Sequence, residues 1–231
     1  MPRISPAAKR AAPVRHRATA PEAKSERRAA IVHAAVNLLR EAPLALFSVE
    51  ALARRAGLAK GTVYLYFGTR EEVLLAVHAQ QAQELFDVVQ RALAAADAHG
   101  RRVVQDGLKY LRAHPEFYPI AGNCRGMLDT GVSTQAALEF KLAVAQRLEP
   151  LGRRIEELYP GLAAGDGVAL LTNCYALIVG LWQQADPPLS LRKVMHRPEM
   201  AIFRIDFEKQ LSAALLDLWE SAERRSRRGL L

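Results

Sequence analysis

Residues 60–70 hold the side chains of this sequence that are best suited to binding a polyanion. Within these eleven residues lie one lysine, one arginine, two threonines and two tyrosines. Ammonium, guanidinium and hydroxyl groups donate hydrogen bonds to phosphate oxygens and to acceptor atoms on base edges. Such contacts require the side chains to stand together on one outward-facing element, and the preceding residues indicate what that element is.

A short helix, a turn and a second short helix are predicted here. Ser48 is a good N-cap for a helix over 49–56 that has an apolar face. Gly57 follows where the helix must end and where positive φ is favoured. A second helix over 59–66 then places Val63 against the first, as two tightly crossed helices require. Taken alone, this spacing is weak evidence for two crossed helices, because alanine-rich sequences produce it by chance.

The continuation makes the pattern specific, and the segment resembles the DNA-binding domain of the TetR family of bacterial transcriptional regulators. Ala59 departs from the family's signature, in which a serine commonly caps the second helix, and Arg70 stands where lysine is usual. The match covers about the first third of the chain. The matching residues are Ala53, Ala56, Gly57, Lys60, Gly61, Thr62, Val63, Tyr64, Tyr66, Phe67, Thr69, Glu71, Glu72, Val73 and Leu74.

This resemblance implies which residues contact double-stranded DNA. Lys60 would donate to guanine acceptors, and Thr62 would offer its hydroxyl or methyl group to a base. The tyrosine hydroxyls and the helix start at Thr69 would contact phosphates. Core packing is the alternative for Val63, for the Tyr64 ring and, as the preferred reading, for Phe67. The predicted contact residues are Ser48, Lys60, Gly61, Thr62, Tyr64, Leu65, Tyr66, Thr69 and Arg70.

The charge distribution agrees with a nucleic-acid partner. The formal net charge is +8, and residues 1–28 supply +6 of it, beside the predicted helix-turn-helix. Arg15, Arg17 and Lys24 are expected to neutralise phosphates or to enter the adjacent minor groove. Residues 220–231 supply the remaining +2, which a solvated tail explains as well.

An all-α fold of about nine helices is expected, as in the TetR architecture. The predicted domains are a disordered basic arm (1–24), a helix-turn-helix domain (25–71), a larger effector-binding and dimerisation domain (72–225) and a basic tail (226–231). The longest apolar run, residues 168–182, falls short of the ~20 residues that a membrane span needs. Two cysteines form no disulfide framework, so a cytoplasmic, nucleoid-associated protein with reduced thiols is expected.

The helical periods give approximate boundaries. Helices are predicted over 25–41, 71–98, 101–113, 116–121, 133–159, 166–184 and 203–223, with a loop over 122–132. Pro150 should kink or split the helix in which it lies. His99 and Gly100 should end the long helix that begins near Glu71.

The last two predicted helices are apolar on two sides, which predicts a homodimer interface of four helices. Small residues on one helix would allow close approach of the partner. The alternative is a thick single-chain core with the final helix in its middle. The predicted interface residues are Ala169, Asn173, Ala176, Gly180, Ile205, Ser212, Leu216 and Trp219.

A pocket for an apolar or aromatic small-molecule effector is expected beside the long helix. Ordinary core packing is the alternative at every position. Arg125 and Asp129 would orient a polar group of the ligand or be solvated in their loop. The candidate pocket walls are Phe86, Val89, Leu111, Phe117, Tyr118, Met127, Leu128, Phe140, Tyr175 and Trp182.

Neither a catalytic constellation nor a metal-binding spacing stands out. The histidines lack metal-ligand spacing and are interpreted as surface or satisfied residues, and no cofactor other than an effector is expected. The prediction is therefore a homodimeric, ligand-responsive repressor that binds a near-palindromic operator. The alternatives are an activator or effector-independent regulator and, less favoured, a DNA-acting enzyme with an appended helix-turn-helix. The histidines are His16, His33, His78, His99, His114 and His196.

Overall fold

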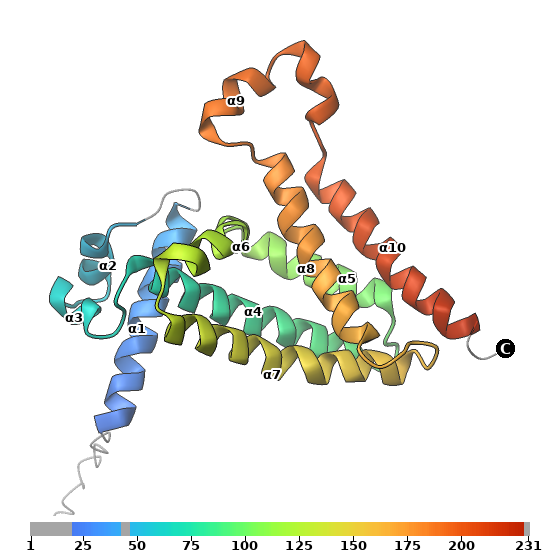
Figure 1. Ribbon diagram of the computed structural model, residues 1–231, viewed down its shortest axis with the longest axis horizontal. Coiled ribbons are helices and arrows are strands. Elements are labelled where there is room, and N and C mark those ends of the chain that lie inside the picture. Colours follow the sequence, from blue (N-terminus) through green and yellow to red (C-terminus); the bar gives the residue numbers. More distant parts are fainter. Residues whose placement is uncertain (1–19, 43–46, 229–231) are drawn as a thin grey trace, which may run out of the picture.

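The computed structural model describes residues 20–42 and 47–228, and this part of the chain is helical almost throughout (Figure 1). No strand occurs among these residues. The predicted all-α class is confirmed. The elements are α1 (Ala20–Glu41), α2 (Val49–Arg55), α3 (Lys60–Tyr64), α4 (Arg70–Ala94), α5 (Gly100–Ala113), α6 (Phe117–Gly126), η1 (Met127–Gly131), α7 (Thr134–Leu158), α8 (Asp166–Ala185), α9 (Leu189–Met195), η2 (Pro198–Phe203) and α10 (Phe207–Arg228).

The first three helices form a unit at one end of the molecule (Figure 1). The Ser48 hydroxyl accepts a hydrogen bond from Ala51 N at 3.1 Å, as an N-cap does. Gly57 makes the turn at φ 67°, a conformation that a side chain would strain. Helix α3 ends at Tyr64, two residues earlier than predicted, and Ala59 provides no side-chain cap. Helix α1 begins at Ala20, so the end of the predicted arm is helical.

Helices α4 and α7 run parallel and side by side from this unit into the rest of the molecule (Figure 1). Gln83 Nε2 donates to the Ala143 carbonyl at 3.0 Å, and Arg147 forms an ion pair with Asp87 one turn further along. Helix α7 continues through Pro150 without a split. Helix α4 ends at Ala94, before the predicted stop, and His99 instead caps α5.

The predicted loop over 122–132 is wrong. Helix α6 continues to Gly126, and residues 127–131 form one π-helical turn. Ile120, Cys124 and Met127 lie on one buried face at helical spacing, and this burial outweighs the low helix propensity of the glycines. Wide helical turns of this kind are frequent at functional sites.

Helices α8 and α10 pack side by side, and the segment between them projects away from the body as an arm (Figure 1). This arm contains α9 and η2, neither of which the sequence predicted. Helix α10 begins at Phe207 rather than at residue 203, because the Asp206 carboxylate accepts from Lys209 N and caps the helix there.

One apolar core joins the three-helix unit to the helices that follow. Ile31, Leu52 and Val63 of the unit are at most 1% exposed. The same core continues through α4 into Ile120 and Phe140. A movement of α6 or α7 would therefore disturb the packing of the three-helix unit directly.

Candidate DNA-binding surface and effector cavity

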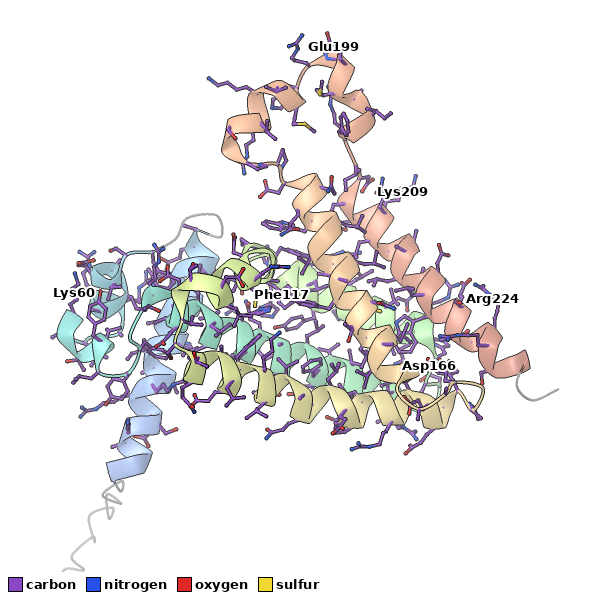
Figure 2. The ribbon with its side chains drawn as sticks, in the orientation of Figure 1. Lys60, Phe117, Asp166, Glu199, Lys209 and Arg224 are labelled. Atoms are coloured by element: carbon purple, nitrogen blue, oxygen red, sulfur yellow. The ribbon has the colours of Figure 1, made fainter. Side chains whose placement is uncertain are left out.

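Helix α3 presents a polar and aromatic face to solvent at the tip of the molecule. Lys60 lies at the outer edge of this unit (Figure 2), and its side chain is 50% exposed. Tyr64 is 46% and Leu65 78% exposed, so the Tyr64 ring is not a core residue. Val63 and Phe67 are buried, as their core interpretation predicts. One face of this short helix is thus packed against the three-helix unit, and the other face is exposed to solvent.

Lys60 is held by an acidic residue of the preceding helix. Its ammonium forms an ion pair with the Glu50 carboxylate at the start of α2. The shared hydrogen bond lowers the pKa of Glu50 and raises that of Lys60, so both groups are charged at neutral pH. Phosphates or bases must therefore compete with Glu50 for this lysine.

The remaining predicted contact residues differ in how available they are. Ser48 and Gly61 are exposed, and a Cβ at Gly61 would meet no atom within 4 Å. Thr62 and Tyr66 are half-buried. Arg70 is paired with Glu71 at 2.7 Å. Of the predicted arm, Arg15 and Arg17 lie outside the described residues.

The start of α4 is bonded to η1 through Thr69. Its hydroxyl accepts from Glu72 N at 3.1 Å, the expected N-cap, and donates to the Gly131 carbonyl at 2.7 Å. The Glu72 carboxylate in turn accepts from Gly68 N at 2.8 Å and from the Ser133 hydroxyl at 2.8 Å. These bonds connect the end of the helix-turn-helix to the N-terminus of α7.

A second connection joins α1 to α6 through a fully buried carboxylate. Glu116 is 0% exposed, and its Oε1 accepts from Arg40 Nε at 3.1 Å and from Gln81 Nε2 at 3.3 Å. Arg40 Nη2 also lies 3.0 Å from His114 Nδ1. Because Arg40 lies in the last turn of α1 and Glu116 precedes α6, this ion pair spans the two predicted domains.

A cavity of about 900 Å³ lies among α4, α5, α6, α7, α8 and α10. Figure 2 shows Phe117, one of its walls, directed into the interior between these helices. Most of the lining is aliphatic or aromatic. The predicted pocket residues that line it are Phe86, Val89, Leu111, Phe117, Leu128, Phe140 and Tyr175.

Three predicted pocket residues lie elsewhere. Tyr118 and Trp182 stack on each other with ring centroids 6.4 Å apart, and Tyr118 also packs edge-on against Phe207. Met127 belongs to the core beneath the three-helix unit. Tyr118 of α6, Met127 of η1 and Trp182 of α8 are not among the residues that line the cavity, a distinction that helical spacing alone did not make.

His78 is the main cavity residue that the sequence interpretation missed. It is 2% exposed, its Nε2 lies 3.1 Å from the Tyr175 hydroxyl, and its ring packs against Phe117 and Phe140. Burial, together with the nearby Lys141 charge, lowers the pKa of His78 to about 4, so the imidazole is neutral at pH 7. Its place on the buried face of α4, four residues after Leu74, was the available signal.

The predicted interface residues fall into three groups by exposure. Ala169, Asn173 and Ala176 are exposed on α8, and a Cβ at Gly180 would meet no atom within 4 Å. Ile205, Ser212 and Leu216 are half-buried. Trp219 must be reassigned: at 2% exposed, it lines the cavity and packs near Tyr159 within its own chain.

Comparison with known proteins identifies the family. A family model described as the tetracyclin-repressor-like C-terminal domain matches residues 79–225. The model of bacterial regulatory proteins of the tetR family matches residues 31–77. The chain belongs to the TetR family. The two matches meet within α4, at residues 77–79, so this helix runs from the matched N-terminal domain into the matched C-terminal domain.

Individual members of the TetR family resemble this chain either over only part of its length or at low sequence identity. The HTH-type transcriptional regulator EthR of Mycobacterium tuberculosis is 45% identical over 69 residues, which are 30% of this chain and 32% of that protein. The chain thus matches about a third of the length of this curated relative. A TetR-family regulator from Streptomyces coelicolor has a TM-score of 0.57 at 20% identity, covering 84% of this chain and 97% of that one. One from Mesorhizobium loti has a TM-score of 0.53 at 17% identity, covering 84% and 96%. At these identities the structural likeness establishes the fold.

Proposed function

We propose that this TetR-family chain is a homodimeric, ligand-responsive transcriptional regulator, and most simply a repressor, that binds a near-palindromic operator in the cytoplasm. The observation that carries the proposal is the exposed face of α3 on a unit whose core is continuous with a domain enclosing a large apolar cavity. A DNA-reading surface and a ligand site are thus built into one packed body.

The DNA-binding part of the proposal rests on the exposed face of α3. Lys60 would contact guanine acceptors in the major groove, while Tyr64 and Leu65 would meet the sugar–phosphate edge or a thymine methyl group. Gly61, with open space at its Cβ position, allows the helix to approach the base edges closely. Two such helices related by a two-fold axis would read half-sites about one helical turn apart.

The dimer is supported by the uncovered apolar surface of α8. This helix is long and apolar enough to cross a membrane by length and composition, yet only 22% of its most apolar window is buried within the chain. Its small residues Ala169, Ala176 and Gly180 leave room for a second helix. An apolar helix face of this kind is normally covered, and a second copy of the chain would cover it.

Two bonded connections would carry ligand occupancy to the DNA-binding unit. Phe117 and Leu128 line the cavity, and each adjoins one of these connections in sequence. Phe117 follows Glu116, which holds Arg40 of α1; Leu128 lies in η1, whose Gly131 accepts from Thr69. A ligand that displaces either wall would change the position of α3, by no more than its preference for the displaced state.

Selection of bound duplexes from a random DNA library by the purified full chain tests this function. The expected result is enrichment of a near-palindrome whose two halves lie about one turn apart, and footprinting should place one protein dimer on it. The Lys60→Ala/Tyr64→Ala double variant is the matched negative. No enrichment over the unselected library, or enrichment of a single unrepeated half-site, would contradict the proposal.

A further inference from the structure

The cavity wall changes from polar to apolar along its length. Hydrogen bonds and ion pairs show that α4 and α7 advance in parallel, from Glu72 opposite Ser133 to Asp87 opposite Arg147. His78 and Lys141 therefore lie toward the DNA-binding unit, whereas Val89 lies far from it. From His78 to Val89 the cavity follows eleven residues of helix, about 16 Å at 1.5 Å per residue.

The far end of the cavity, here termed the apolar end, contains no charged group among the described residues that line it. Helix α5 starts at this end, because Gly100 follows shortly after α4 ends at Ala94, and Gly100 N donates to Glu223 of α10 at 3.1 Å. A Cβ at Gly100 would lie 2.6 Å from Trp219, which places that ring at the same end. The lining residues of the apolar end are Val89, Val103, Val104, Leu108, Leu148, Leu215 and Trp219.

The end near the DNA-binding unit, here termed the polar end, carries the ionisable groups of the lining. Arg125 and Asp129 lie 3.6 Å apart and compensate each other. Lys141 also lines this end, and no carboxylate of the described residues lies within ion-pair distance of it. Its Nζ is 5.8 Å from the centroid of Phe140, whose ring lies 5.7 Å from that of His78. The polar end therefore has one uncompensated positive charge beside neutral hydrogen-bonding groups.

We infer that the cavity binds a single-chain amphiphile with an anionic head, a medium-chain or long-chain carboxylate, with its head at Lys141 and the Tyr175 hydroxyl and its tail toward Trp219. This inference rests on the proposed function of the cavity as an effector site and names the class of effector. An apolar chain gains free energy along the aliphatic walls in proportion to the area buried. The carboxylate needs a cation and a hydroxyl donor when it leaves water, and the polar end offers both.

The length of the cavity sets the expected size of the tail. At ~1.2 Å per bond, taken from the three-bond repeat of an extended chain, 16 Å corresponds to about thirteen bonds, or a chain of about fourteen carbons. Helices α5 and α10 pack together at the apolar end, so the affinity gained with each added carbon should stop rising near this length. A bulky or multiply charged ligand would leave most of the aliphatic wall uncovered.

Calorimetric titration of the full chain in the absence of DNA tests the inference. Decanoate, decanol and decylamine have the same tail and differ only in the head, and each is used below its micelle concentration. Decanoate should bind roughly three- to tenfold more tightly than decanol, the factor expected for one partly exposed, charge-assisted contact. Decylamine should bind most weakly, because its charge repels Lys141. Equal or tighter binding of decanol, or of decylamine, would overturn the inference.

A matched pair of lysine substitutions locates the head. Lys141→Met should remove the preference for decanoate and leave decanol affinity unchanged within about twofold. Lys109→Met removes the same charge from the exposed side of α5, outside the cavity lining, and should change neither affinity. An unchanged preference in Lys141→Met would refute the placement of the head.

Measurement of DNA affinity separates this inference from the proposed function. If decanoate binds with the stated preference and DNA affinity does not change, the ligand class stands and ligand-responsive regulation falls. If decanol binds as tightly and releases DNA, regulation stands and the anionic head is refuted.

Discussion

Lys60 is the residue at which base recognition can be tested most directly. It stands exposed at the start of α3 and is paired with Glu50. Lys60→Ala should remove about 1–3 kcal/mol of discrimination at the base pair that it contacts, and little at the others. Competition binding on a panel of operators with single base changes measures this loss.

The Lys60 test has two internal comparisons. Glu50→Gln releases the lysine and removes a negative charge from the surface that faces phosphates, so it should raise affinity without a change in base preference. Lys109→Ala, on α5, should change neither quantity. If Lys60→Ala weakens all operators equally, the lysine contacts a phosphate and base reading must lie elsewhere on α3.

His78 should make the stability of the protein fall as the pH drops below 6.5. Its pKa is about 4 in the folded chain, against an ordinary value of 6.5, because the imidazole is buried. Above pH 6.5 both states are neutral at this site and no cost arises. Between pH 6.5 and 4 the unfolded chain takes up a proton that the folded chain refuses, which lowers the unfolding free energy by about 1.4 kcal/mol per pH unit.

Urea unfolding at pH 7 and pH 5 checks the contribution of His78. The loss of unfolding free energy between these pH values should be about 2 kcal/mol smaller in His78→Phe than in the parent chain. Phe is chosen because the site is walled by Phe117 and Phe140. His33→Gln, at an exposed position of α1, should retain the full loss. Identical pH dependence in His78→Phe and the parent would show that the folded chain protonates His78 as readily as the unfolded chain does, which would contradict the prediction.

At the scale of elements, the Arg40–Glu116 pair connects α1 to the start of α6. Replacement of Arg40 by Met leaves a fully buried carboxylate without its cation. Loss of one partner of a buried pair costs ~3–5 kcal/mol, and we expect about 1–3 kcal/mol here because Arg40 is 48% exposed. In a double-mutant cycle with Glu116→Gln, the unfolding free energies should be non-additive by about 1 kcal/mol or more.

The matched control for this cycle is an ion pair that stays within one domain. Arg147→Met and Asp87→Asn break the pair between α7 and α4, which is partly exposed on both sides. Their interaction energy should lie below about 1 kcal/mol. Additive effects of Arg40→Met and Glu116→Gln, within about 0.3 kcal/mol, would show that the two domains are not coupled at this point.

The elements that the sequence predicted well depend on local signals. Ser48, Gly57 and Thr69 act through bonds or dihedral angles within a few residues, so each could be placed before the structure was known. The π-helical turn at 127–131 and the arm that contains α9 were not predicted. Met127 is buried against the three-helix unit, which is distant in the sequence. Leu191 and Ile202 are exposed, and the segment that holds them is too short for its apolar residues to show a helical period.

The sequence could predict the composition of the cavity wall but not which side of a helix faces the cavity. Phe117 and Tyr118 are neighbours with similar chemistry, yet only Phe117 lines the cavity. Trp219 shows the same limit, because its helix is apolar on two sides and the fold decides which side meets the subunit's own core. His78 was passed over because a lone histidine carries no motif, and its significance comes from Tyr175, 97 residues later in the chain.

For the whole molecule, the uncovered face of α8 is the feature that a single chain leaves unexplained. Apolar and small residues occupy much of it, and the arm adds exposed Leu191, Val194, Ile202 and Phe203. In the proposed function, the homodimer that buries this face binds one duplex through its two α3 helices. The state of assembly and the mode of DNA binding should therefore change together.

Gly180→Leu tests this linkage. A leucine at this position adds bulk to the proposed contact and meets no atom of its own chain within 4 Å at Cβ, so the fold should be retained while the dimer is lost. Sedimentation equilibrium should give the monomer mass, and affinity for a two-half-site operator should fall by at least about tenfold because the second half-site no longer binds intramolecularly. Gly107→Leu is the matched control: it lines the cavity, also has open space at Cβ, and should remain dimeric. A Gly180→Leu protein that sediments as a normal dimer would move the interface away from α8, whereas a monomer that still binds the full operator with undiminished affinity would separate dimerisation from DNA recognition.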